Sequence, residues 1–410
     1  MSWAKVALEK HLDLISGPAF KSANFTENEV DIPLVKGDNI SQGYIDWNKS
    51  KYWPQNDVEK YSQYWLEEGD VILAMDRPWV TAGLKYSWIK PNDPRALLVQ
   101  RVARMRGQNG LLTDYLRYIV SSKHFSDYIK NIMGGTNVPH ISGKQIKAYE
   151  ISLPPESTQE EIVKHLNNYD DLIENNKRRI ELLEDSARQL YKEWFVRFRF
   201  PGHEHIKVID GIPEGWKLEE LSELCHFRAG GTFKLEYQGR DEGEIPFIKV
   251  RDMNSPGNKI YIIEADNWVT EDECSSFRGK AFAAGAIVFA KIGEALKKNR
   301  VRLISQNTLI DNNMMGAIPN KDKANSFYLY MKLKSLDFGS ISGGAAVPFL
   351  SAKALGKEKV IVPSKLILDE FGEVTEAIYS QIENLQRQIV YLQKARNLLL
   401  PKLIGGEIAV

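Results

Sequence analysis

The sequence predicts an α+β protein made by internal duplication, with two globular α/β domains separated by two long helices that pair as an antiparallel coiled coil. Three observations lead to this prediction. Apolar residues recur at alternating steps of four and three over residues 159–198, and the same seam returns over residues 369–404. Short motifs of the first globular part also reappear, in order, in the second. A chain of 410 residues is besides too long for one compact core.

The first long helix is expected between Gln159 and Phe198, with Thr158 and Glu161 forming a capping box at its start. Its heptad spacing is typical of a helix that pairs along a narrow stripe, because the residues beside the seam are polar and charged. Two ordinary core helices of one large domain are the alternative interpretation. The seam consists of Ile162, Leu166, Tyr169, Ile173, Asn176, Ile180, Leu183, Ala187, Leu190 and Trp194.

The second long helix repeats this seam 209 residues later, and Pro401 is expected to end or kink it near Leu400. Because the ends of a compact domain usually lie close together, the first helix should enter the second domain near the point where the second helix leaves it. The pair is therefore predicted to be antiparallel, with a pseudo-two-fold relation. Asn176 corresponds to Leu385, so a role in fixing register is a hypothesis. The second seam consists of Phe371, Thr375, Ile378, Ile382, Leu385, Ile389, Leu392, Arg396, Leu399 and Leu403.

The globular parts repeat as well. The stretch 32–36 (IPLVK) resembles 245–249 (IPFIK), and 68–74 (EGDVILA) resembles 284–290 (AGAIVFA), each with the character of a buried strand. The glycine turn 134–142 (GGTNVPHIS) resembles 343–351 (GGAAVPFLS). The predicted domains are residues 1–155 and 201–363, and the predicted helical segments are residues 156–200 and 364–410.

Composition excludes several classes of protein. The longest apolar runs are too short for a membrane span, and two cysteines among 410 residues give no disulfide framework, so a cytoplasmic location is expected. There is no phosphate-binding loop and no cluster of metal ligands, so we expect neither a metal nor a cofactor on this chain. With 54 basic and 54 acidic residues, any basic patch must be local. These features indicate a binding protein without catalytic activity.

Basic side chains at strand ends and in loops are the candidate contacts to DNA. Lysine and arginine contact phosphates whatever the sequence, while arginine, asparagine and glutamine read base edges. A solvated charged face is the alternative interpretation for each of them. The candidates in the first domain are Lys36, Arg77, Arg101, Arg104, Arg106, Thr136, Asn137 and His140. Those in the second domain are Lys249, Arg251, Lys291, Lys297, Lys298, Arg300 and Arg302.

Taken in order, these repeats resemble the specificity (S) subunit of type I restriction–modification enzymes. The resemblance rests on the two domain-plus-helix units, on 213–216 (PEGW) and 230–232 (GGT) at the start of the second domain, and on the Gly-Gly-x-x-Val-Pro turn before each helix. The first domain departs from the pattern, since it begins with 1–3 (MSW) and has 16–18 (SGP) in place of Gly-Gly-Thr. The domains have therefore diverged.

The resemblance implies that each globular domain is a target recognition domain that reads one half of a split sequence in double-stranded DNA, with the helix pair setting the spacing. It also implies two methylation (M) subunits and restriction/translocase (R) subunits as partners, which would bind S-adenosylmethionine, ATP and Mg. A non-DNA structural adaptor with two protein-binding heads is one alternative. The recognition subunit of a single-complex system that methylates and cuts beside its site is another.

Overall fold

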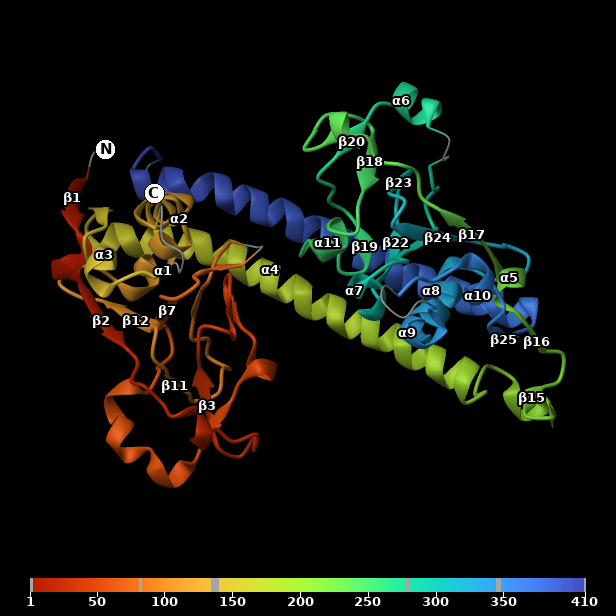
Figure 1. The fold of residues 1–410 in the computed structure, drawn as a ribbon, viewed down its shortest axis with the longest axis horizontal. Helices are drawn as coiled ribbons and strands as arrows, with labels where there is room; N and C mark the ends of the chain where they lie inside the picture. Colours follow the sequence, from red (N-terminus) through yellow and green to blue (C-terminus); the bar gives the residue numbers. More distant parts are fainter. Residues whose placement is uncertain (1–2, 81–82, 134–139, 278–280, 344–347, 409–410) are drawn as a thin grey trace. The chain divides into compact units, whose positions relative to one another are not determined.

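The computed structural model describes residues 3–80, 83–133, 140–277, 281–343 and 348–408 (Figure 1). The chain forms two compact units. Unit 1 contains residues 1–171 and 393–410, and unit 2 contains residues 172–392. Each unit holds one globular domain and a segment of each long helix, α4 (Glu156–Tyr191) and α11 (Lys365–Gly405).

Domain 1, the globular part of unit 1, is built on a four-stranded antiparallel sheet with the strand order β10-β7-β12-β2. These strands are β2 (Leu12–Ser16), β7 (Val71–Ala74), β10 (Tyr86–Trp88) and β12 (Val102–Gly107). A second sheet has the order β11-β3-β6, from β3 (Ile32–Val35), β6 (Tyr52–Trp53) and β11 (Leu97–Leu98). The first strand, β1 (Ala4–Ala7), pairs with the last, β13 (Glu150–Leu153), and so closes the domain.

The described part of domain 1 also contains three α-helices, four very short strands and several short 3-10 turns. The helices are α1 (Thr113–Ser121), α2 (Lys123–Ile132) and α3 (Gly143–Lys147). The short strands are β4 (Ile40–Ser41), β5 (Tyr44–Ile45), β8 (Trp79–Val80) and β9 (Gly83–Leu84).

Domain 2, the globular part of unit 2, has the same plan. Its main sheet has the order β17-β24-β21-β22-β19, from β17 (Cys225–Ala229), β19 (Tyr261–Ile262), β21 (Ile287–Ala290), β22 (Val301–Ile304) and β24 (Met314–Pro319). Its second sheet has the order β20-β18-β23, from β18 (Ile245–Ile248), β20 (Trp268–Val269) and β23 (Leu309–Ile310). Here β16 (Lys217–Glu220) pairs with β25 (Lys359–Val362) to close the domain.

Short helices connect the strands of domain 2, and a small hairpin precedes it. The helices are α5 (Leu221–Leu224), α6 (Glu271–Ser276), α7 (Glu294–Lys297), α8 (Ser326–Ser335), α9 (Phe338–Ile341) and α10 (Ala352–Gly356). The hairpin consists of β14 (Val208–Ile209) and β15 (Ile212–Pro213). The two domains share closure, the order of four strands in the main sheet and the parallel pairs β3–β11 and β18–β23, while β19 adds a fifth strand to the main sheet of domain 2. The predicted α+β duplication is thus confirmed.

In unit 1 the beginning of α4 packs beside the end of α11. Ile162 and Leu166 of α4 share a buried core with Leu400 and Leu403 of α11 and with domain 1, and Leu399 packs against this core. At the edge of the core, Asp170 of α4 forms an ion pair with Arg396 of α11. Tyr118 of α1 donates a hydrogen bond to Asp170 (2.7 Å), so domain 1 contacts the helix pair through a polar bond as well.

In unit 2 the later part of α4 packs beside the earlier part of α11. The seam residues of this segment are buried or packed against the buried core: Ile173, Ile180, Leu183, Leu190, Ile378, Ile382, Leu385, Ile389 and Leu392. Asn176 lies among them with only 5 % of its surface exposed. In unit 1 the beginning of α4 packs with the end of α11, and in unit 2 a later part of α4 packs with an earlier part of α11. This order confirms the antiparallel pairing.

Two details at the helix ends differ from prediction. The first helix begins at Glu156, and the N–H groups of Thr158 and Gln159 donate to the carbonyl of Pro155, so the predicted cap at Thr158 is wrong. The helix can start directly after the two prolines, because the N–H groups of the first helical turn have no partner within the helix and a proline there loses no hydrogen bond. The second helix continues through Pro401 to Gly405 rather than ending near Leu400. Leu400 and Leu403 are buried in the core of unit 1, and this packing holds the last turn.

A buried glutamine attaches each globular domain to a long helix. In unit 1, Gln159 is fully buried, and its amide accepts from the N–H of Leu112 (2.9 Å) and donates to the carbonyl of Gly110 (2.7 Å). In unit 2, Gln386 is 3 % exposed; it accepts from the N–H of Tyr261 (3.0 Å) and donates to the carbonyl of Gly257 (2.8 Å). Backbone groups of both domains thus find their partners on the helices.

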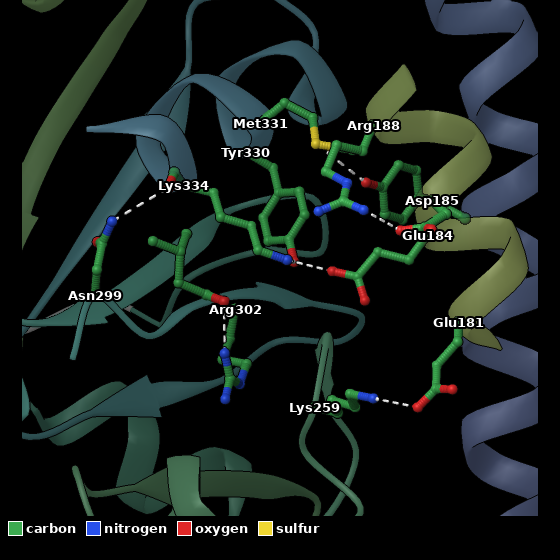
Figure 2. A network of polar contacts seen from close by, with 12 residues as sticks. Glu181, Glu184, Asp185, Arg188, Lys259, Asn299, Arg302, Tyr330, Met331 and Lys334 are labelled. Carbon is green, nitrogen blue, oxygen red and sulfur yellow. Dashed lines mark hydrogen bonds and ion pairs between the residues drawn. The ribbon is translucent and has the colours of Figure 1, made fainter. Parts of the chain in front are cut away.

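Charged contacts add to the packing of domain 2 on α4 (Figure 2). Lys334 of α8 reaches Glu184 of α4, and its Nζ lies 3.4 Å from the hydroxyl of Tyr330. Closer to the sheet, Lys259 pairs with Glu181 (3.1 Å), as Figure 2 shows. Two of the charged residues that flank the seam of α4, Glu181 and Glu184, therefore bind domain 2.

Candidate nucleic-acid interface

Three of the predicted contact residues of domain 1 meet at one end of its main sheet, around Asp76. We call Asp76, Arg77, Arg101 and His140 the domain 1 cluster. Arg101 Nη1 lies 2.7 Å from Asp76 Oδ2, and His140 Nδ1 pairs with Asp76 Oδ1. The backbone joins the same segments, since Ile141 donates to the carbonyl of Met75 (2.8 Å) and Met75 to that of Arg101 (2.9 Å). Arg101 and His140 keep more than half of their side chains exposed.

The two arginines of the domain 1 cluster have left-handed backbone conformations. The φ angle is 44° at Arg77 and 64° at Arg101. For a residue with a Cβ this conformation costs roughly 1–2 kcal/mol, so it is rare outside glycine and asparagine. In domain 2 the residue at the place of Arg77 is Gly293, with a φ of 72°. Strain of this kind is concentrated at functional sites, and here it presents two exposed guanidinium groups.

Lys36 lies near this cluster. Val99 donates to the carbonyl of Val35 (3.1 Å), which places Lys36 at the same end of the strands as Arg101. A Cβ on Gly37 would lie 4.0 Å from the carbonyl oxygen of Asp76. The Lys36 ammonium pairs with Asp38 (3.2 Å) and stays in reach of solvent.

Arg104 is buried, which corrects its prediction as a DNA contact, and Arg106 is only half-buried but is bound by carboxylates. Arg104 is 5 % exposed and forms an ion pair with Asp13 of the neighbouring strand. Arg106 is bound by Asp70, which is itself buried, and by Glu67 (2.9 Å). It lines a groove of about 660 Å³ that also contains Glu67, Glu68, Asp70, Asp114 and Glu160. A groove with this many carboxylates repels phosphate. Thr136 and Asn137 lie outside the described residues.

In domain 2 the corresponding end of the sheet is occupied by two lysines and an exposed aromatic ring. Lys249 Nζ lies 3.5 Å from the centre of the Phe233 ring and donates to Gln238 Oε1 (2.8 Å). Lys291 Nζ lies 5.8 Å from the ring of Phe349, which is 44 % exposed. The bridge between Ile292 and Phe349 repeats the bridge between Asp76 and His140 in domain 1. We call Lys249, Lys291, Asp311, Asn313 and Phe349 the domain 2 cluster.

Asp311 is the buried member of the domain 2 cluster and is 6 % exposed. Burial raises the pKa of Asp311, while hydrogen bonds from Asn313 and the nearby charges of Lys249 and Lys291 oppose this shift. The Asp311 carboxylate accepts from the N–H of Asn313 (3.0 Å). Its role is structural, because it holds the turn that carries the exposed asparagines.

Within the described residues, the remaining basic candidates of domain 2 form no ion pair or hydrogen bond with this cluster. Arg251 forms an ion pair with Asp266, and Lys297 pairs with Glu294 (2.7 Å) on α7. Lys298 is exposed and Arg300 is half-buried. Arg302 donates to the backbone carbonyls of Asn258 and Met253, and burial lowers its pKa. Arg302 therefore supports a loop.

Comparison with known families accounts for both domains. The family model for the type I restriction modification DNA specificity domain matches residues 2–185 and again residues 213–396.

The chain belongs to this family.

Two specificity subunits are similar to this chain over more than two thirds of their length. The MjaIX specificity subunit of Methanocaldococcus jannaschii is 29 % identical over 309 residues, covering 74 % of this chain and 71 % of the relative. The HindI specificity subunit of Haemophilus influenzae is 24 % identical, with 79 % and 86 % covered. The crystal structure of the type I S subunit from M. genitalium has the same fold, with a TM-score of 0.61 at 16 % identity and 98 % of this chain covered.

As a type I specificity subunit, the chain recognises specific DNA sequences with two domains and is the non-catalytic part of its enzyme. Within the described ranges, no set of three or more His, Cys, Asp or Glu side chains is arranged to hold a metal ion. None of the helices described is both long and apolar enough to cross a membrane.

The sequence-based prediction for this specificity subunit missed three exposed amides. Gln100 precedes Arg101, and Asn312 and Asn313 occupy the corresponding turn of domain 2; all three are exposed. For Gln100 the available signal was its position between two segments with strand character, 96–99 (ALLV) and 102–105 (VARM). A polar residue in that position is typical of a turn between strands.

Proposed function

We propose that each domain reads one half of a bipartite site in double-stranded DNA, and that the paired segments of α4 and α11 set the length of unread DNA between the halves. One observation carries this proposal. Both domains present the same strand-end geometry but different side chains: Arg77, Arg101 and His140 in one, and the half-buried Lys291 with the exposed Asn313 and Phe349 in the other. Two domains with the same backbone arrangement but different side chains can recognise two different half-sites.

Exchange of one domain tests the division of labour. Residues 1–155 would be replaced by the corresponding domain of a relative, and the hybrid would be co-expressed with its methylation subunit. The methylated motif should change in one half only, as read by genome-wide mapping of modified adenines. A change in both halves would contradict the proposal.

The spacing role has its own test. Insertion of one heptad next to Asn176, matched by one next to Leu385, lengthens both helices in register. The unread gap should become longer while both half-sites stay the same. An unchanged gap would show that the helices do not set the spacing.

For the assembly, we propose two M subunits and R subunits as partners, in the cytoplasm, with S-adenosylmethionine, ATP and Mg bound by those partners. Exposed apolar side chains on the long helices support docking: Leu172, Leu182, Tyr391 and Leu398 are each at least half exposed. Native mass spectrometry of the co-expressed complex should give two M subunits per specificity subunit, and a different ratio would overturn the stoichiometry.

A salt titration separates DNA reading from the rival role of a protein adaptor. Binding that releases counterions from phosphates weakens steeply with salt, by roughly 10³-fold or more between 50 and 200 mM for six or more phosphate contacts. Sequence-specific binding with this dependence is the expected result. Salt-independent binding to the two domains, by proteins only, would support the adaptor.

A further inference from the structure

Two exposed turns occupy the same place in the two domains. Gln100 and Arg101 connect β11 to β12, and Asn312 and Asn313 connect β23 to β24. In both domains the turn leaves a short strand of the second sheet and enters a central strand of the main sheet. It therefore projects from the junction of the two sheets, next to the cluster of that domain.

The same three backbone hydrogen bonds hold each turn. In domain 1, Val99 donates to Val35, Gly17 to Val102, and Met75 to Arg101, over 3.1, 3.1 and 2.9 Å. In domain 2, Asp311 donates to Ile248, Gly230 to Met314, and Lys291 to Asn313, over 2.9, 3.2 and 3.0 Å. Such agreement between domains that differ in sequence shows that the position of the turn is part of the shared fold.

A glycine without room for a side chain lies against each turn. A Cβ on Gly17 would lie 2.3 Å from the carbonyl oxygen of Val99, and one on Gly230 would lie 2.0 Å from that of Asp311. These distances are far shorter than van der Waals contact, so only glycine allows the two chain segments to pack this closely. Packing and hydrogen bonds thus fix the turns, while their side chains differ.

The side chains of the turns are exposed and are of the kinds that read bases. The side chain of Arg101 is 68 % exposed, and Asp76 binds its Nη1, which is one of the three nitrogens that carry the five N–H donors of a guanidinium. Within the described residues, neither the Gln100 nor the Asn312 side chain makes a hydrogen bond. Arginine matches the edge of guanine, and asparagine or glutamine matches the edge of adenine, each by two hydrogen bonds in the major groove.

We propose that these turns are the base-reading tips of the two domains. Arg101 would bind guanine in the half-site of domain 1, and Asn312 and Asn313 would bind adenine in the half-site of domain 2. The neighbouring cations, Arg77 in domain 1 and Lys249 and Lys291 in domain 2, lie beside the tips and would contact phosphates. This inference rests on the proposed function, because it assigns chemistry to the DNA-facing end of each domain.

The test compares methylated motifs of single variants, each co-expressed with the methylation subunit in a host without that modification. Arg101→Asn keeps the left-handed backbone, which asparagine tolerates. It should relax a G·C position in the half-site of domain 1 by roughly 5- to 150-fold and leave the other half intact. Asn313→Ala should relax an A·T position in the half-site of domain 2 to a similar extent. Gln100→Ala gives a second probe of the first turn if Arg101→Asn lowers the yield of folded protein.

Matched controls lie at the opposite ends of the same strands. Asn109 follows β12 in a left-handed turn (φ 50°), and Asn320 follows β24, so Asn109→Gly and Asn320→Ala should leave the motif unchanged. An unaltered motif in Arg101→Asn, Gln100→Ala and Asn313→Ala alike would overturn the inference while leaving the proposed function standing. So would an equal fall in methylation at every site, because that result marks a phosphate contact. A wild-type complex that modifies no defined motif would overturn the proposed function and this inference together.

Discussion

The side chain of Asn176 on α4 donates a hydrogen bond from Nδ2 to Oε1 of Gln388 on α11, over 3.1 Å. Asn176 is 5 % exposed and lies between Ile173 and Ile180 on the seam. A buried amide at such a position lowers the stability of a coiled coil but favours one register. The sequence repeat makes Asn176 equivalent to Leu385 and does not indicate a partner for it. The structure shows that this partner is Gln388.

Replacement of this amide should stabilise the protein. Asn176→Leu buries apolar surface in the seam and leaves the exposed Gln388 to water, so the free energy of unfolding should rise by about 1–2 kcal/mol. Urea denaturation measures the change. Asn175→Leu, one residue away on the exposed face, is the control and should stay within about 0.5 kcal/mol of wild type. Lower stability of Asn176→Leu would show that the hydrogen bond outweighs the apolar packing.

The glutamine that attaches domain 2 to α11 should be among the costliest positions to change. In Gln386→Leu the N–H of Tyr261 and the carbonyl of Gly257 lose their buried partner, and each unsatisfied group costs about 1–3 kcal/mol. We expect a loss of about 2–4 kcal/mol in chemical denaturation. Gln381→Leu, at an exposed position of the same helix, should be nearly neutral. Equal effects of the two substitutions would count against the attachment role.

Two adjacent glycines should respond in opposite ways. Gly230→Ala puts a Cβ 2.0 Å from a backbone oxygen, so the turn must shift and the variant should lose about 1–3 kcal/mol or more. In Gly231→Ala the nearest atom lies 3.7 Å away, which is ordinary contact. The second variant should match wild type or gain up to about 1 kcal/mol, because alanine restricts the unfolded chain. Thermal melting of both variants decides the matter, and similar melting temperatures would refute close packing at Gly230.

The stability of domain 2 should depend on pH through Glu273. Hydrogen bonds from Arg240 (2.8 Å) and the N–H of Thr270 lower the pKa of Glu273 from 4.5 to about 2. A carboxylate with a lowered folded-state pKa stabilises the fold above its unfolded-state pKa, and this contribution is lost as the pH falls from about 4.5 toward 2. Glu273→Gln should therefore be less stable than wild type at pH 7, and the difference should shrink below pH 4.5.

Denaturation across that pH range is the measurement. Glu271→Gln, in the same turn of α6 but without the arginine partner, should show a smaller dependence. A difference between Glu273→Gln and wild type that stays constant down to pH 3 would contradict the assignment.

The sequence was sufficient for features that repeat or have a period. The seams of α4 and α11 follow from heptad spacing, and the strands at 32–36 and 245–249 follow from two similar apolar runs. The direction of the pairing was accessible for a different reason, since the two ends of a compact domain usually lie close together.

Individual basic residues were much harder to place. Arg101 and Arg104 are three positions apart at one strand, yet one is exposed and the other is buried against Asp13, 91 residues away in sequence. Pairing of β12 with β2 and β7 decides between these outcomes, and single-sequence periodicity does not contain that pairing. The same holds for Arg302, whose partners are backbone carbonyls of a distant loop.

The antiparallel packing in unit 1 has a consequence for synthesis on the ribosome. Ile162 and Leu166 are synthesised more than 200 residues before Leu400 and Leu403, with which they share a core. At a translation rate of about 5–20 residues per second, roughly 10–50 s pass between the synthesis of this segment of α4 and that of the α11 residues that pack on it. Translation that stops before Leu400 would leave the side of this stripe that packs on α11 uncovered, so nascent and truncated chains should depend on chaperones more than the full chain does.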